Sequence, residues 1–130
     1  MTADSTMPIL VVDDYQTMVR IICNLLKQIG YENVDTASNG AQALERIAEK
    51  RYGLIISDWN MQPMTGFELL VKLKSEAPTA DIPFIMVTAE SKTDNVIAAR
   101  KAGVSSYIVK PFNAATLKAK IDAVFTARAA

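Results

Sequence analysis

Apolar residues in this sequence fall into two patterns that alternate along the chain. Five short runs have the length of β-strands and occur at residues 9–12, 34–37, 54–57, 84–87 and 107–109. Between them, apolar residues recur every three or four positions, as on one face of an amphipathic helix. The first of these stripes runs from Met18 to Ile29 and stops at Gly30, a residue typical of helix ends. The pattern therefore predicts the order βαβαβαβαβα.

Weaker helical stripes follow the later runs, and their apolar residues are Ala43, Leu44, Ile47 and Ala48, then Phe67, Leu70 and Leu73, then Val96, Ile97 and Ala99, and last Leu117, Ile121, Val124 and Phe125. Strict alternation over short connections predicts an α/β fold with a mostly parallel sheet that is covered by helices on both faces. We treat residues 1–130 as one domain, with residues 1–6 as a flexible N-terminal tail.

Polar side chains follow four of the five apolar runs. Asp13 and Asp14 follow the first run, Asp58 the third, Thr88 the fourth and Lys110 the fifth. In doubly wound sheets the ligand site lies outside the carboxyl ends of the strands, so we expect these side chains to share one edge. The sequence predicts that its chemistry is carried there.

Two adjacent carboxylates after an apolar strand repel each other unless a cation or a proton compensates. Carboxylate oxygens suit Mg²⁺, which is commonly held by one or two acidic residues and a phosphate. The alternative is that Asp13 and Asp14 only cap the following helix. Asp58 can serve as a third ligand or as a nucleophile toward phosphorus. Taken singly, Lys110 could be an ordinary surface lysine and Thr88 a turn or cap residue.

Composition excludes several other classes of function. Basic and acidic side chains number 14 each, so no net charge recruits nucleic acid or an anionic membrane. The chain has no histidine and one cysteine, which excludes histidine-based catalysis, zinc sites of the usual kind and disulfides within the chain. We interpret Cys23 as a packing residue. With no export signal or membrane-spanning run, we expect a cytoplasmic protein.

The motifs "LVVDD", "LIISDWNM", "MVTAE" and "YIVKPF", in this order, resemble the receiver domain of two-component response regulators. The similarity extends from Met7 to Phe125, and within the family "GFELL" and "KPFNAATL" are most similar to single-domain chemotaxis regulators. The resemblance implies a flavodoxin-like, doubly wound (βα)5 fold with five parallel strands in the order 2-1-3-4-5.

The resemblance also implies a role for each residue at the carboxyl edge. Asp58 would be the phosphoacceptor, assisted by Lys110 and Thr88, with Mg²⁺ as the cofactor. The metal ligands would be Asp13, Asp14, Asp58 and the backbone carbonyl of Asn60. Thr88 and Tyr107 would form the switch, and the residues two beyond Asp58 and Thr88, which are Asn60 and Glu90, would tune dephosphorylation. The Lys110–Pro111 bond would be cis.

The implied function is a phosphorylation-activated signalling switch in chemotaxis, and not an enzyme beyond its own phosphoryl transfer and autodephosphorylation. A histidine kinase would be the phosphodonor, and the flagellar motor switch or another protein would be the target of a monomeric regulator, with a phosphatase as a further possible partner. The partner face would comprise Lys92, Val96, Tyr107 and Lys120. The alternative is a relay or phosphate-sink receiver that exchanges phosphoryl groups with a histidine phosphotransfer domain.

The sequence departs from the family pattern in two places. Gln62 stands where the family usually has proline, with Pro63 one position later, and Thr65 replaces a frequent acidic residue before Gly66. On the partner face, Thr93 and Arg100 also differ from the family pattern. Met61, Met64 and Trp59 near the acceptor either contact a partner or pack as loop residues, and we expect Trp59 to be partly exposed.

Two functions of other classes fit less well. A magnesium-dependent phosphatase with an aspartyl nucleophile usually has a second acid two residues later, where this chain has Asn60. A flavodoxin-type cofactor binder would need a phosphate-binding loop after the first strand. This chain has Asp13 and Asp14 there, and their negative charge would repel a phosphate.

Overall fold

The computed structural model describes residues 6–89 and 93–129, and strands and helices alternate along them. The strands are β1 (Ile9–Val12), β2 (Val34–Ala37), β3 (Leu54–Asp58), β4 (Phe84–Thr88) and β5 (Ser106–Val109). The helices are α1 (Gln16–Gln28), α2 (Gly40–Glu49), α3 (Gly66–Lys74), α4 (Thr93–Lys101) and α5 (Ala114–Ala129). The predicted element order is therefore confirmed.

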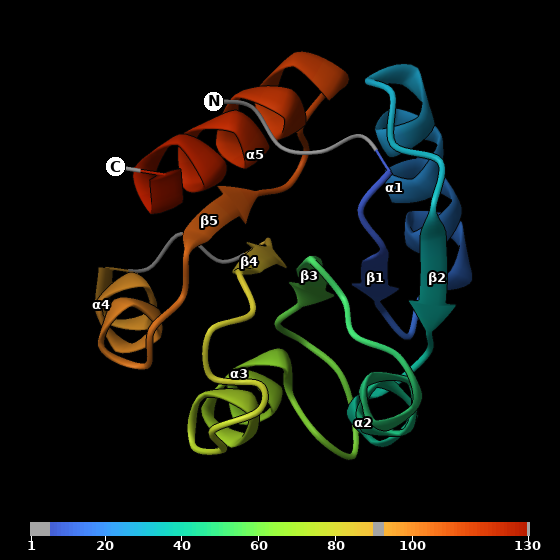
Figure 1. The fold of residues 1–130 in the computed structure, drawn as a ribbon. Helices are drawn as coiled ribbons and strands as arrows, with labels where there is room; N and C mark the ends of the chain where they lie inside the picture. Colours follow the sequence, from blue (N-terminus) through green and yellow to red (C-terminus); the bar gives the residue numbers. More distant parts are fainter. Residues whose placement is uncertain (1–5, 90–92, 130) are drawn as a thin grey trace.

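All five strands pair in parallel in one sheet, in the order β2-β1-β3-β4-β5 that the resemblance implied. Figure 1 shows α1 and α5 on one face of this sheet and α2, α3 and α4 on the other. The direction of winding reverses between β1 and β3. In this fold, that reversal places the ligand site at the carboxyl ends of these two strands.

The core has one layer on each face of the sheet, which explains the uninterrupted apolar runs. In β1, Ile9 and Val11 pack toward α1 and α5, whereas Leu10 and Val12 pack toward α2 and α3. All four of these side chains are fully buried. Successive residues of a strand point to opposite faces, so a strand that is covered on both faces must be apolar at every position.

Three residues of the predicted helical stripes are exposed instead of buried, and the first of them is Ile21 on α1, at 43 %. Ala48 on α2 is exposed, and Ile97 on α4 is 45 % exposed, while Ala43 and Ala99 on the same helices are fully buried. At about 100° per residue, Ala48 lies about 140° around the helix from Ala43, and Ile97 about 160° from Ala99. The buried face of each helix is therefore narrower than the distribution of its apolar residues predicted.

One residue near the acceptor that differs from the family pattern has a clear local role. Thr65 is the N-cap of α3, and its hydroxyl oxygen accepts a hydrogen bond from the backbone N–H of Glu68 at 3.1 Å. The Glu68 carboxylate accepts in return from the backbone N–H of Thr65 at 3.0 Å. This reciprocal capping box satisfies two donors at the start of the helix. Thr65 therefore fixes where α3 begins.

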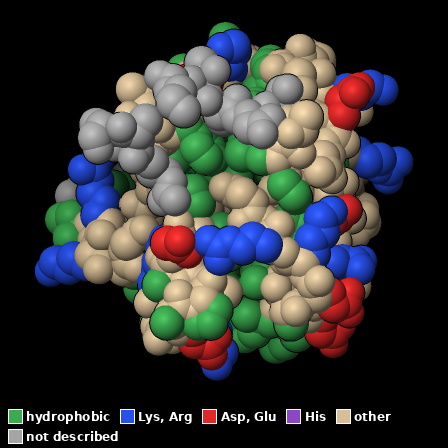
Figure 2. All heavy atoms as spheres, viewed as in Figure 1, with side chains coloured by type: hydrophobic (Ala, Val, Ile, Leu, Met, Phe, Trp, Pro, Cys, Tyr) green, Lys and Arg blue, Asp and Glu red, His purple; other side chains and the backbone are tan. Residues whose placement is uncertain are grey.

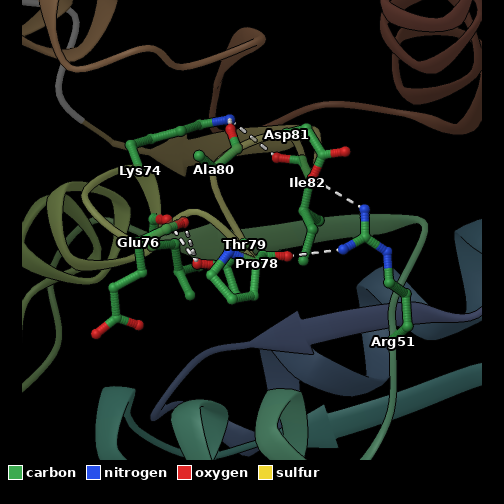
Figure 3. Close-up of polar contacts among 9 residues, drawn as sticks. Arg51, Lys74, Glu76, Pro78, Thr79, Ala80, Asp81 and Ile82 are labelled. Atoms are coloured by element: carbon green, nitrogen blue, oxygen red, sulfur yellow. Dashed lines mark hydrogen bonds and ion pairs between the residues drawn. The ribbon is translucent and has the colours of Figure 1, made fainter.

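Polar contacts tie the loops together at the amino ends of β3 and β4 (Figure 3). Arg51 donates to the carbonyl of Pro78 at 2.7 Å and pairs with Asp81 at 2.9 Å. Lys74 donates from Nζ to the carbonyls of Ala80 at 2.9 Å and Ile82 at 3.0 Å. These contacts lie at the opposite edge of the sheet from Asp13 and Asp58.

The surface agrees with the balanced composition. Figure 2 shows Lys and Arg side chains on several parts of one face, with Asp and Glu side chains among them. In the part of the chain that the structure describes, no helix combines the length and apolar character needed to cross a membrane.

Candidate functional site

Three carboxylates meet at the carboxyl edge of the sheet. One oxygen from each of Asp13, Asp14 and Asp58 lies within 4.8 Å of the others. Asp13 and Asp14 follow β1, Asp58 ends β3, and these two strands are direct neighbours in the sheet. Asp13 is 1 % and Asp58 5 % exposed, whereas Asp14 is exposed. The structure thus brings together the carboxylates that the strand-end pattern assigned to one edge.

Lys110 reaches into this cluster from the end of β5. Its Nζ donates a hydrogen bond to Oδ1 of Asp58 at 2.9 Å and lies 3.7 Å from Oδ2 of Asp13. Its backbone N–H donates to the carbonyl of Thr88 at 2.8 Å. The side chain of Lys110 is 20 % exposed, so its ammonium group contacts buried carboxylates and not only solvent. The Lys110–Pro111 bond is cis, as is Gln62–Pro63.

Asp13 lies in an unfavourable electrostatic position. Its Oδ1 accepts from the backbone N–H of Tyr15 at 3.0 Å, while its buried Oδ2 has no hydrogen-bond partner among the described residues. Burial raises the pKa of Asp13 to about 6; the charge of Asp58 also raises it, and the Tyr15 hydrogen bond and Lys110 oppose the rise. This buried carboxylate oxygen has the Lys110 ammonium at 3.7 Å as its ion-pair partner and accepts no hydrogen bond from the described residues, so a further cation can bind to it.

Helix capping does not account for the two adjacent acids. The N-cap of α1 is Tyr15, which makes no side-chain capping hydrogen bond, and the first turn of α1 contains no acidic residue. Asp13 instead shapes the turn before the helix through its single bond to the backbone of Tyr15. The second aspartate, Asp14, has no such role in the turn.

The donors at this edge fit a hard divalent cation. Three carboxylates face one ammonium group, that of Lys110, which leaves negative charge uncompensated. All available ligand atoms are oxygens, the type that Mg²⁺ prefers. Asn60, whose carbonyl is the fourth ligand expected from the resemblance, lies in the loop two residues after Asp58 and has an exposed side chain. Its part in metal binding stays a prediction.

The acceptor loop after Asp58 is held at both ends. The backbone N–H of Trp59 donates to the carbonyl of Val87 at 3.0 Å, next to the fully buried Thr88. The carbonyl of Trp59 accepts from the N–H of Gly66 at 2.9 Å, which closes the loop onto the start of α3. A Cβ at position 66 would collide with the carbonyl oxygen of Asp58. Glycine is therefore required there by the close approach of the two backbones.

The two methionines of the acceptor loop pack inward. Met61 is 2 % exposed and belongs to the core layer beneath α2 and α3. Met64 is half-buried against Gly40, where an added Cβ would lie 2.6 Å from the Met64 sulfur. Of the two interpretations, loop packing is the one that the structure supports for these residues. Gln62 and Pro63 between them are exposed.

An aromatic group beside the acceptor was not predicted from the sequence. The half-buried Trp59 stacks on Phe67 of α3, with ring centroids 5.3 Å apart and an interplanar angle of 24°. Trp59 also meets Tyr107 of β5 edge-on, at 6.4 Å and 69°. These three residues come from three separate elements, and no spacing rule links them. The partial exposure expected for Trp59 is what the structure shows.

The predicted partner face is partly described. Tyr107 and Lys120 line a cavity of about 240 Å³ together with Arg100, Val104, Ser105 and Ser106. Val96 on α4 is half-buried. Glu90 and Lys92 lie outside the described residues. Arg100, which the sequence singled out only as a departure from the family pattern, thus lines the same cavity as two predicted residues.

Comparisons with known proteins agree with this geometry. A model of the response regulator receiver domain matches residues 9–122. The chain is 43 % identical over 122 residues to the chemotaxis protein CheY-3 of Vibrio cholerae, covering 94 % of each chain, and 44 % identical over 119 residues to the chemotaxis protein CheY of Pseudomonas aeruginosa, covering 92 % of this chain and 96 % of that one.

A high-resolution structure of the chemotaxis response regulator CheY4 of Vibrio cholerae matches with a TM-score of 0.84 at 33 % identity, and the match covers 92 % of this chain and 98 % of that one. The fold and the order of the strands therefore agree with those of the matched structure. This chain belongs to the response regulator receiver domain family, and its relatives include chemotaxis regulators of the CheY type.

Proposed function

We propose that this receiver domain is a phosphorylation-activated switch of a chemotaxis pathway in the cytoplasm, and that Asp58 accepts the phosphoryl group from a histidine kinase. The observation that carries this proposal is the 2.9 Å contact between Lys110 Nζ and the buried Asp58 carboxylate, inside a cluster of three acids. A fixed cation beside a nucleophilic carboxylate stabilises the charge that moves onto the transferred oxygens. The protein signals by contact and is not an enzyme with an external product.

In the proposed step, a carboxylate oxygen of Asp58 forms a bond to phosphorus while the P–N bond of a phosphohistidine breaks. The imidazole leaves with the electron pair and takes up a proton. The product is an aspartyl acyl phosphate, which water later hydrolyses to the free carboxylate and inorganic phosphate. Lys110 and the Thr88 hydroxyl would bind phosphoryl oxygens, and Asn60 and Glu90 would set the rate of hydrolysis.

Mg²⁺ would be held by Asp13, Asp14, Asp58 and the carbonyl of Asn60, and when bound it supplies charge neutralisation at the phosphoryl oxygens. The support for this cofactor is the oxygen-only donor set and the buried Asp13 Oδ2 without a hydrogen bond. These two features concern the metal-free protein, so they support the site independently of the phosphoryl chemistry.

The output would be a change at the partner face, with Thr88 and Tyr107 as the switch and Lys92, Val96 and Lys120 as contact residues of a monomer. The flagellar motor switch is the proposed target, since the matched relatives are chemotaxis proteins. Among the described parts of this face, the cavity between Arg100 and Lys120 offers positive charge to a partner.

Intact-mass measurement after rapid quenching tests the acceptor directly. With acetyl phosphate and Mg²⁺, the wild-type chain is expected to gain one hydroxylamine-labile phosphoryl group, and Asp58→Asn is expected to gain none. Asp35→Asn is the matched control, because Asp35 lies on the edge strand β2 and pairs with Lys50 away from the acid cluster. A phosphoryl group that persists in Asp58→Asn would overturn the assignment.

Binding to the motor-switch protein of the same organism tests the target. The phosphorylated wild type is expected to bind more tightly than the unphosphorylated chain or Asp58→Asn. Rapid return of the phosphoryl group to a histidine phosphotransfer domain, without any gain in affinity for the motor switch, would favour the relay function instead.

A further inference from the structure

Met64 of the acceptor loop packs against Gly40, the first residue of α2. A Cβ on Gly40 would lie 2.6 Å from the Met64 sulfur, 2.8 Å from the Met64 Cβ and 2.9 Å from its Cγ. Gly40 is buried and its φ is not positive, so its backbone conformation does not require glycine. The contact with Met64 is therefore what leaves no room for a larger residue at position 40.

The segment that leads into α2 is also bonded to the residue that follows β1. The backbone N–H of Asp13 donates to the carbonyl of Ala37, the last residue of β2, at 3.1 Å. Gly40 begins α2 three residues later, and Asn39 caps this helix by accepting from the backbone N–H of Gln42 at 2.8 Å. The start of α2 is therefore fixed close to the bond that holds the Asp13 backbone.

Met64 itself belongs to the loop that carries the acceptor. This loop leads from Asp58 to Gly66, whose backbone N–H donates to the carbonyl of Trp59 at 2.9 Å. The Met64 side chain is half-buried and packs against the core layer beneath α2 and α3. A single side chain thus links the segment that carries Asp58 to the segment that bonds Asp13.

We propose that Met64 is a positioning residue for the acid cluster: by packing on Gly40, it fixes the acceptor loop relative to the segment that bonds Asp13. Asp13 and Asp58 each contribute an oxygen to this cluster, and these oxygens lie within 4.8 Å of each other. Mg²⁺ demands near-ideal octahedral geometry, so a displaced ligand lowers its affinity. This inference rests on the proposed function and deepens it, because it assigns control of Mg²⁺ affinity to a residue that is not a proposed ligand.

A change of rotamer cannot make room for a Cβ at position 40. The Met64 Cβ is attached directly to the backbone, and a separation of 2.8 Å is well inside the contact distance of two carbon atoms. Gly40→Ala must therefore displace the backbone of one of the two segments. Met64→Ala instead releases the acceptor loop, because it removes the sulfur and the Cγ without adding any atom.

Amide hydrogen exchange tests the contact first, in the metal-free protein. The reporter is the N–H of Gly66, whose bond to Trp59 closes the acceptor loop. Its exchange is expected to be at least tenfold faster in Gly40→Ala and in Met64→Ala, while the amides of β1 keep the wild-type rate and report an intact fold. Unchanged exchange at Gly66 in either variant would overturn the inference. If Gly40→Ala fails to fold, Met64→Ala decides alone, since it introduces no collision.

The second measurement is the dissociation constant for Mg²⁺, obtained by titration calorimetry. Gly40→Ala and Met64→Ala are each expected to raise it at least threefold. In the double variant the increase should be well below the product of the two single effects, because both substitutions disrupt the same contact. Gly53→Ala is the matched control: an added Cβ there would lie 3.1 Å from the Cβ of another methionine, Met7, but next to the amino end of β3. Its dissociation constant should equal that of the wild type.

Two results of the titration would overturn the inference. One is a Met64→Ala variant that binds Mg²⁺ as tightly as the wild type does. The other is a double variant in which the single effects multiply, because the two residues would then act separately. A wild type that binds no Mg²⁺ would refute the metal site of the proposed function, whereas the exchange rate of Gly66 would still decide whether Met64 holds the acceptor loop.

Discussion

At the residue scale, Asp13 is subject to two opposing demands. Cation binding needs its charged form, yet burial makes that form unfavourable in the metal-free protein, where its pKa is raised from 3.8 to about 6. A raised carboxyl pKa stabilises the folded state below the unfolded value of 3.8, and this contribution is lost as the pH rises through about 6. At neutral pH, Asp13 therefore weakens the fold that presents it.

We expect Asp13→Asn to stabilise the metal-free protein at pH 7, because the neutral amide removes the cost of a buried charge. The gain in free energy of unfolding should be about 1–3 kcal/mol. The gain should shrink as the pH falls from 7 toward 4, where Asp13 itself becomes protonated. Mg²⁺ should stabilise the wild type and leave the stability of the variant unchanged, so that the wild type becomes the more stable of the two. Thermal unfolding with and without Mg²⁺ at several pH values checks both effects.

Asp14→Asn is the matched control for this prediction. Asp14 contributes an oxygen to the same cluster but is exposed. Asp14→Asn should reduce the stabilisation of the protein by Mg²⁺. It should not stabilise the metal-free protein as much as Asp13→Asn does. An Asp13→Asn variant that is less stable than the wild type at pH 7 without metal would contradict the electrostatic account of Asp13.

The convergence of the site residues could be predicted because parallel strands end at the same edge. For Asp13, Asp58 and Lys110, the positions of the strands that they follow were enough to predict that they lie close together. Side-chain orientations could not be predicted in this way. The single hydrogen bond of Asp13 to Tyr15 and the stacking of Trp59 on Phe67 depend on the path of two loops, which apolar periodicity does not describe.

At the element scale, the loop between β3 and α3 places the acceptor. The capping box of Thr65 and Glu68 fixes the start of α3, and Gly66 lets the backbone pass close to the carbonyl of Asp58. The hydrogen bond from Gly66 to Trp59 closes the loop. The start of the helix and the position of the acceptor are therefore set by the same few backbone contacts.

Gly66→Ala should disturb the acceptor and the fold together. The added Cβ would collide with the Asp58 carbonyl oxygen and lie 3.0 Å from the Cα of Trp59, so the loop has to move. We expect a loss of about 1–3 kcal/mol in free energy of unfolding, as for other overpacked sites. Phosphorylation by acetyl phosphate should slow at least severalfold. Denaturant unfolding and quenched intact-mass kinetics measure the two effects.

Gly30→Ala separates backbone strain from this collision. Gly30 has a positive φ of 101° but nothing within 4 Å of an added Cβ. The substitution should therefore cost about 1 kcal/mol of stability and leave the phosphorylation rate unchanged. If both glycine variants were phosphorylated at the wild-type rate, the close approach at Gly66 would not be what places the acceptor.

The limits of the elements also show where sequence patterns fail. β3 and β4 each extend one residue beyond their apolar runs, to Asp58 and Thr88, because polar residues at strand ends still pair in the sheet. In the helices, Ala48 and Ile97 looked like members of a buried stripe but lie beyond the arc that the sheet covers. Apolar character alone does not give the width of that arc.

At the scale of the whole molecule, the edge formed by the carboxyl ends of the strands and the edge formed by their amino ends have different roles. The carboxyl edge contains Asp13, whose buried charge opposes folding at neutral pH. The amino edge joins loops through bonds that support the fold, including Arg51 to Asp81 and Lys74 to two carbonyls (Figure 3). Changes at the amino edge should therefore alter stability while leaving the chemistry intact.

Lys74→Met tests this separation. The variant keeps most of the aliphatic side chain but loses the Nζ hydrogen bonds to Ala80 and Ile82, and bonds of a charged donor contribute about 1.5–3 kcal/mol. We expect a loss of stability of that order in denaturant unfolding. The phosphorylation rate should match that of the wild type, because the bonds lie at the edge of the sheet opposite Asp58.

Lys72→Met provides the comparison, because among the described residues the Lys72 ammonium makes only a surface pair with Glu76 at 3.0 Å, and both side chains are about half exposed. Such exposed pairs contribute about 0.5 kcal/mol or less, so this variant should unfold almost as the wild type does. Suppose instead that Lys74→Met slowed phosphorylation as strongly as Gly66→Ala. The amino edge would then be coupled to the acceptor through the length of β3 and β4, and stability and chemistry would not be divided between the two edges.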